Sequence, residues 1–179
     1  EHFTSLGVAV SLMCRNPLLE YGPKAFSDHK KGLCTYDVEQ VVLAIVVTTG
    51  IASIFLTKDF TPAYNSGLAH AVFYALTQYP VIEQRHLHGE VVGFGVLLAL
   101  LVDGQEEEFE KVYQLNREIG LPVSLEQIEI TEDEWKESME RIPEMSDVAH
   151  YPYKVTREML EDAMQKLKER VRKDQSHEE

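Results

Sequence analysis

The sequence predicts an all-α protein, a bundle of about eight helices with little or no sheet. Apolar residues recur at helical spacing along most of the 179 residues. Capping residues and glycines mark helix starts and ends, as in the Thr-Glu-Asp-Glu run at 131–134 and the glycine at 120. We find neither an internal repeat nor a phosphate-binding glycine motif. A hydrophobic content of 44% is enough for one core, so we expect a single helical domain over residues 1–179.

The N-terminal part is expected to form helices separated by breaks. Residues 3–15 carry one apolar stripe, and Asn16-Pro17 has the residue types of a new helix start. Gly22-Pro23 should then kink or divide the second helix, because proline donates no backbone N–H and clashes with the preceding turn.

Residues 36–50 are expected to form the next helix, with Thr35 as its N-cap and Gly50 at its end. The β-branched run at 41–47 also fits a buried strand, but the length and the caps favour a helix. Residues 41–57 are uncharged yet short for a bilayer span, so we expect no membrane partner. Insertion would instead predict that the protein depends on detergent.

A loop over residues 51–65 is predicted to lead into the part of the chain that carries most chemical information. Loops ahead of a ligand-bearing helix often line a substrate cleft, so Phe60 and Ser66 are candidates for substrate binding. A plain connection explains the same composition equally well.

Three histidines lie on either side of one turn in the stretch GLAHAVFYALTQYPVIEQRHLHGEVVGFG, residues 67–95. The first helix of this stretch has one apolar face, made of Leu68, Val72, Ala75, Leu76 and Tyr79. Its neighbouring face carries Ser66, His70, Phe73 and Thr77. Pro80 is expected to end the helix, and the turn after it brings His86 and His88.

The second helix of the stretch is expected to begin at about residue 89 and to lie among other helices, because it is apolar on every side from 91 to 102. A histidine at a helix N-terminus lies in a positive field that favours neutral imidazole, whose free lone pair can bind a metal. His70 and His88 are therefore candidate metal ligands. A zinc or iron site needs at least three protein ligands, so packed or solvated histidines are the alternative.

The remaining helices are predicted to be peripheral. An acidic start and the glycine at 120 bound an amphipathic helix, and a capping box at 131–134 begins the helix that bears Trp135. Thr156 is expected to cap a final helix with a charged outer face.

A formal charge of −13 and a pI near 4.9 argue against a nucleic-acid partner, since a phosphate backbone would be repelled by this surface. Only Cys14 and Cys34 occur, without metal-binding spacing, so a disulfide framework is not expected and a reducing, cytoplasmic setting fits best.

Three motifs carry a resemblance to a known family: GLAHAVFYALT, HLHGEVVGFGVL and REIGLPVSLEQI. With them the chain resembles the C-terminal helical domain of the iron-containing alcohol dehydrogenase superfamily, which has a dehydroquinate synthase-like fold, nearest its glycerol dehydrogenase branch. The resemblance extends to about Gln127. The final helices match only in general character.

The resemblance implies a metal-containing, NAD(P)-dependent dehydrogenase of alcohols or polyols. In that family two histidines, here His70 and His88, hold one zinc or iron ion together with an aspartate of a Gly-Asp motif. No such motif occurs in residues 1–50, so the resemblance implies that the aspartate and a nucleotide-binding domain for NAD or NADP lie upstream. It also implies a homo-oligomer and an isolated chain that is inactive by itself.

Two further positions gain a role from the resemblance. His86 lies where relatives also carry histidines, so we expect it to orient substrate or to pass a proton, as a catalytic residue. Phe73 stands where many relatives have another histidine, which makes it a candidate for substrate binding and preference. The alternative function is a non-catalytic helical interaction module that has kept the scaffold, favoured by the acidic surface and the missing third ligand; metal content separates the two.

Overall fold

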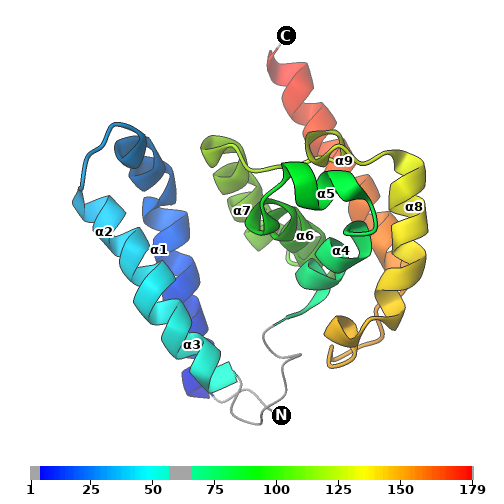
Figure 1. The fold of residues 1–179 in the computed structure, drawn as a ribbon, viewed down its shortest axis with the longest axis horizontal. Coiled ribbons are helices and arrows are strands. Elements are labelled where there is room, and N and C mark those ends of the chain that lie inside the picture. Colours follow the sequence, from blue (N-terminus) through cyan, green and yellow to red (C-terminus); the bar gives the residue numbers. More distant parts are fainter. Residues whose placement is uncertain (1–4, 57–65, 179) are drawn as a thin grey trace. The chain divides into compact units, whose positions relative to one another are not determined.

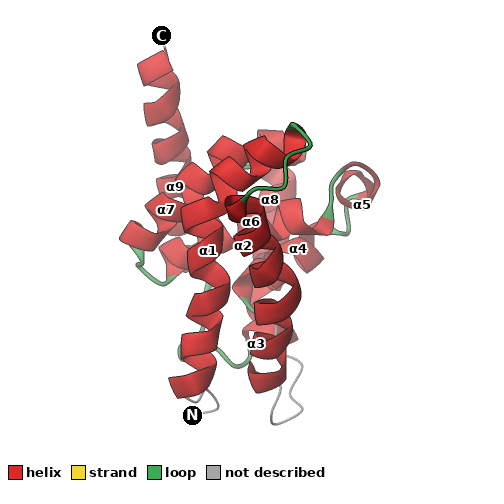
Figure 2. Ribbon diagram, turned by 90° about the vertical axis from the view of Figure 1, so that its left-hand side faces the viewer, coloured by secondary structure: helices red, strands yellow, loops and turns green. Residues whose placement is uncertain are grey.

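The computed structural model describes residues 5–56 and 66–178, and these fall into two compact units, Glu1–Asn65 and Ser66–Glu179, which are described one at a time. The prediction of an all-α fold is confirmed, since every regular element in the described residues is helical and none is a strand (Figure 2). The expectation of one domain over residues 1–179 stays a prediction.

The first unit is an antiparallel helical hairpin (Figure 1). Its first arm is α1, Ser5–Lys30, and its second arm is a continuous run of α2, Tyr36–Leu43, a π-helical segment, Ala44–Thr48, and α3, Thr49–Leu56. A polar cluster closes the turn: Asp28 accepts hydrogen bonds from Lys24 Nζ at 2.6 Å and from Thr35 Oγ1 at 2.9 Å. The hairpin is thus closed at its turn by charged and polar contacts.

Some helix boundaries predicted for this unit are wrong. Asn16-Pro17 does not start a new helix, because Pro17 lies inside α1. Gly22-Pro23 does not divide α1 either, and the predicted kink at this point stays a prediction. The second arm does not end at Gly50 and residues 51–56 are not a loop, since the helix continues to Leu56. Proline removes single hydrogen bonds from a helix, and packing along a partner helix can compensate for them.

The helical prediction for the β-branched run 41–47 is confirmed, but most of its large side chains are exposed. By length and composition alone the run Tyr36–Ile54 is sufficient to cross a bilayer, with a mean hydropathy of 1.6 and 11% of it buried. Soluble proteins contain helices of the same length and composition. The absence of a membrane partner therefore stays a prediction.

The second unit packs its helices around a single apolar core (Figure 1). Its elements in chain order are α4, Leu68–Leu76; α5, Pro80–Arg85; α6, His88–Val102; α7, Glu106–Ile119; α8, Glu132–Arg141; and α9, Arg157–Glu178. Short 3₁₀ turns at Glu126–Ile128, Ile142–Glu144 and Ser146–Val148 link the later helices. The helix predicted to end at Pro80 ends earlier, at Leu76, and Pro80 begins α5 where the sequence predicted a turn.

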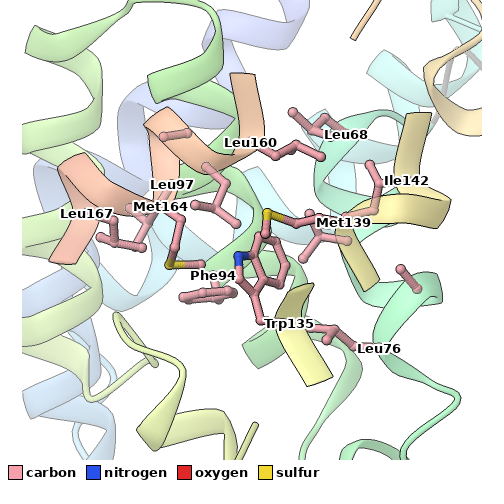
Figure 3. Close-up of a cluster of buried hydrophobic side chains, with 14 of the residues drawn as sticks. Leu68, Leu76, Phe94, Leu97, Trp135, Met139, Ile142, Leu160, Met164 and Leu167 are labelled. Carbon is pink, nitrogen blue, oxygen red and sulfur yellow. The ribbon is translucent and has the colours of Figure 1, made fainter. Parts of the chain in front are cut away.

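The core confirms the predicted central position of α6. Every residue of α6 from Val91 to Val102 is buried or half-buried. Figure 3 shows its side chains among those of neighbouring helices, with Phe94 and Leu97 close to Trp135, Met139 and Met164. Because α6 is enclosed, its N-terminal end is presented from a rigid body.

The predicted caps of two later helices are also present. Thr131 Oγ1 accepts the N–H of Glu134 at 3.3 Å, while the Glu134 carboxylate accepts the N–H of Thr131 at 2.8 Å, so the capping box forms. Thr156 Oγ1 accepts the N–H of Met159 at 3.4 Å at the start of α9.

Candidate functional site

Two imidazoles meet where α4 passes the start of α6. His70 lies in the first turn of α4 and His88 is the first residue of α6. The centroids of their rings lie 5.6 Å apart, with the ring planes inclined by 43°. The predicted convergence of these two histidines is therefore present in the structure.

A glycine permits the close approach of the two helices. A Cβ on Gly95 would lie 2.6 Å from the carbonyl oxygen of Ala69 and 2.9 Å from its Cα, distances that real side chains do not adopt. Ala69 is the residue next to His70. The absence of a side chain at Gly95 thus lets α6 touch the backbone that carries the first histidine.

The apolar face of α4 points inward as predicted. Leu68, Val72, Ala75 and Leu76 are buried, and the neighbouring face that carries His70 is half-buried. Tyr79, predicted on the same apolar face, lies beyond the end of α4 and is half-buried. Tyr151, from a distant loop, accepts the Leu68 N–H through its hydroxyl oxygen at 3.3 Å, which satisfies one of the free N–H groups at the helix start. Both sequence pattern and a long-range contact therefore fix the orientation of α4.

The environment of His70 favours its neutral form. Partial burial lowers the pKa of His70, and the neighbouring charge of His88 lowers it further, while the carboxylate of Asp147 acts in the opposite direction. A neutral imidazole retains a free lone pair. Asp147, in the 3₁₀ turn Ser146–Val148, is a neighbour of the site that the sequence pattern did not indicate.

Phe73 packs against the imidazole of His88. The ring centroids of Phe73 and His88 lie 4.4 Å apart in an edge-on arrangement, and Tyr74 lies 6.4 Å from His70. Such aromatic contacts restrict the orientation of an imidazole. Ser66 is half-buried just before α4, and Phe60 lies outside the described residues.

His86 is enclosed by carboxylates at the end of α5. Its side chain is 10% exposed, with Nε2 at 3.4 Å from a Glu129 oxygen and Nδ1 at 3.6 Å from a Glu90 oxygen. The same Glu90 carboxylate accepts the N–H of Leu87 at 2.9 Å. The catalytic role expected of His86 stays a prediction; its surroundings are those of a side chain that joins structural elements.

A local sequence pattern predicts the position of only one of the two carboxylates near His86. Glu90 is the third residue of α6, where an acid commonly accepts a backbone N–H of the preceding turn. Glu129 comes from a connector about forty positions further along the chain, and no local pattern marks it. Only the folded chain brings it to the turn.

The two imidazoles fit a divalent metal ion as part of its ligand set. Zinc and iron accept imidazole nitrogen at about 2.1 Å, and two rings with centroids 5.6 Å apart leave room for one ion between them. Within residues 5–56 and 66–178, no three His, Cys, Asp or Glu side chains are grouped so as to hold a metal. The described part of the chain thus offers two ligands and requires a third from elsewhere.

A separate groove of about 630 Å³ lies between the connector after α7 and the C-terminal helix α9. Its walls include Leu125, Glu129, Met164 and Lys168, but neither His70 nor His88. The groove is therefore distinct from the imidazole pair.

Curated proteins and solved structures that resemble this chain both include glycerol dehydrogenases. No protein-family model matches the chain. Among curated proteins, the chain is 34% identical over 134 residues to a glycerol dehydrogenase of Escherichia coli O6:H1, and 34% identical over 135 residues to one of Pseudomonas putida. Each match covers 73% of this chain and 33% of the relative. The chain thus spans about a third of the length of these relatives.

Two solved structures share the fold. A probable glycerol dehydrogenase from Sinorhizobium meliloti superposes with a TM-score of 0.77 at 24% identity, covering 95% of this chain and 47% of that one. Glycerol dehydrogenase from Schizosaccharomyces pombe gives 0.76 at 22% identity, covering 97% and 43%. These findings confirm the resemblance predicted from the sequence: the chain is similar to the C-terminal helical domain of the iron-containing alcohol dehydrogenase superfamily, in its glycerol dehydrogenase-like branch.

Proposed function

We propose that this chain is the metal-binding catalytic part of an NAD(P)-dependent alcohol or polyol dehydrogenase. The observation that carries the proposal is the pair of imidazoles, His70 and His88, with ring centroids 5.6 Å apart on two helices that pack tightly at Gly95. Similarity to glycerol dehydrogenases supports the class of reaction.

In this proposal His70 and His88 hold one zinc or iron ion together with an aspartate supplied by sequence upstream. When bound, the ion acts as a Lewis acid that lowers the pKa of a substrate hydroxyl. The lowered pKa of His70 keeps its lone pair available near neutral pH. Phe73, whose ring packs edge-on against that of His88, would restrict the orientation of this imidazole and, with Ser66, would meet the substrate. Phe60 is proposed for substrate binding from the sequence alone.

The nicotinamide, NAD or NADP, would be bound mainly by an upstream nucleotide-binding domain. The present chain contributes one side of the cleft, where its side chains exclude water from the reacting hydroxyl. A homo-oligomer in the cytoplasm is part of the same proposal. His86, which lies between the carboxylates of Glu90 and Glu129, would orient the substrate or pass a proton.

The deciding experiment is elemental analysis of the protein produced with its native upstream sequence. We expect one zinc or iron ion per chain, lost in His70→Ala and in His88→Ala. His29→Ala, an exposed position in the other unit, serves as the matched control and should retain the metal. Absence of metal from the unchanged protein, or metal that both substitutions leave in place, would overturn the proposal in favour of a non-catalytic interaction module.

A further inference from the structure

The turn before His88 buries no apolar side chain of its own, although core residues flank it on both sides. Two residues, His86 and Leu87, have extended backbones between α5 and α6. Leu87 is 73% exposed, so its side chain contributes little to fixing the turn. His88 is itself exposed, and the ring of Phe73 packs edge-on against its imidazole. The buried side chains of α6 set the direction of the helix, so any further restraint on the turn itself comes from polar contacts.

Polar side chains contact this turn from two sides. On the α6 side, Glu90 accepts the Leu87 N–H and faces Nδ1 of His86. On the other side, Glu129 forms an ion pair with Arg85 at 2.6 Å and faces Nε2 of His86 at 3.4 Å. The carboxylate of Glu129 therefore joins the turn to the connector after α7, by an ion pair with Arg85 and by a contact with His86 Nε2 that is not a hydrogen bond.

The backbone of Glu129 has an uncommon conformation for its residue type. With φ of 57° and ψ of 35°, it is the one non-glycine residue with positive φ within the part of the chain that the structure describes. It ends the 3₁₀ turn Glu126–Ile128, a position where glycine is the favoured residue. A glutamate at this position has an unfavourable backbone conformation, but unlike glycine it provides a carboxylate.

We propose that Glu129 is a positioning residue for His88, acting through Arg85 and His86 to fix the turn from which α6 begins. This inference rests on the proposed function, because positioning matters chemically only if His88 is a metal ligand. Residues around metal ligands commonly change metal affinity by tenfold or more when they are substituted. Glu129 acts one step further out, so we expect the lower end of that range.

The test compares two substitutions that remove the carboxylate in different ways. Glu129→Gln keeps the length of the side chain and the backbone cost, whereas Glu129→Gly also relieves the positive φ. Glu126→Gln is the matched control, since this glutamate lies on the same 3₁₀ turn and its carboxylate contacts Ser124 instead of the turn before His88. All variants are made in the protein with its upstream sequence.

Zinc affinity is measured by competition with a chelator. We expect both Glu129 variants to bind zinc about tenfold more weakly than the unchanged protein, and Glu126→Gln to bind it equally well. The visible spectrum of cobalt(II) in place of zinc should change in both variants, because it reports ligand geometry. In the metal-free protein, amide exchange should become faster at Leu87 and Glu90 while the unfolding temperature of Glu129→Gly does not fall.

Several results would overturn the inference. Unchanged zinc affinity in both variants would do so, as would a loss in only one of them, since both lack the carboxylate. A loss that follows a lowered unfolding temperature in both variants would show a general structural role instead. If the unchanged protein binds neither zinc nor iron, the proposed function fails and this inference with it; if it binds the metal and the variants bind it equally well, only this inference fails.

Discussion

The two units are both helical and both rich in apolar residues, yet they use those residues in opposite ways. Among the described side chains of the unit Glu1–Asn65, the buried apolar ones are Val10, Ala25, Ala44 and Ala52, whereas many of the large ones are exposed, including Val42, Ile45, Val46 and Ile54. In the unit Ser66–Glu179 large side chains such as Trp135, Phe94 and Leu97 are fully buried.

The comparison teaches that apolar content alone does not locate a core. A single hairpin can bury only the seam between its two arms, so many of the large side chains on its outer faces stay exposed. Several helices around α6 enclose their side chains on all sides. Both candidate metal ligands belong to the enclosed unit, where rigid packing can hold two imidazoles in register.

The largest expected effect on stability comes from shortening an apolar side chain to alanine in each unit. Leu97→Ala should lower the free energy of unfolding by about 3 kcal/mol, because it leaves a cavity in a closed core. Val46→Ala, at a side chain that is 68% exposed, should change it by less than about 0.5 kcal/mol. Urea denaturation of each variant measures both values, and equal losses would remove the distinction between the units.

A smaller effect is expected from adding one methyl group where α4 and α6 touch. Gly95→Ala should destabilise the protein by about 2 kcal/mol, since the new Cβ would overlap the backbone of Ala69. Gly89→Ala on the same helix meets nothing within 4 Å, so it should be neutral or stabilising by about 0.5 kcal/mol. Thermal unfolding provides the comparison; a Gly95→Ala protein as stable as Gly89→Ala would contradict the close contact.

The smallest effect is a pH dependence that belongs to His70. Its pKa is lowered in the folded chain by partial burial and by His88, so on acidification the unfolded chain takes up the proton first. The free energy of unfolding should therefore fall as the pH drops through about 6.5 toward the folded pKa. His70→Gln should remove this part of the slope, as measured by denaturation of the metal-free protein between pH 5 and about 8. An identical slope in both proteins would exclude the expected environment of His70.

Much of the fold follows from local patterns, and the exceptions have a common cause. The period of 3.6 residues correctly placed the inward face of α4 and the central position of α6, and cap residues placed the start of α8. No helix boundary occurs at Pro17 or Gly50, and Pro23 does not divide α1. Propensity describes an isolated segment, whereas a long partner helix stabilises residues that would break a helix alone.

For the candidate site, the sequence by itself determined which residues face outward together and which start a helix. That was sufficient to select His70 and His88, because spacing along one helix and a position at the start of another are local properties. The tertiary structure alone decided that the two rings lie 5.6 Å apart and that Phe73 packs edge-on against His88. It also brought Glu129 to the turn at His86 from about forty positions away. Such contacts depend on how two helices cross and on where a glycine lets them approach closely, as Gly95 does. The pattern within one segment does not specify which other segment it will contact.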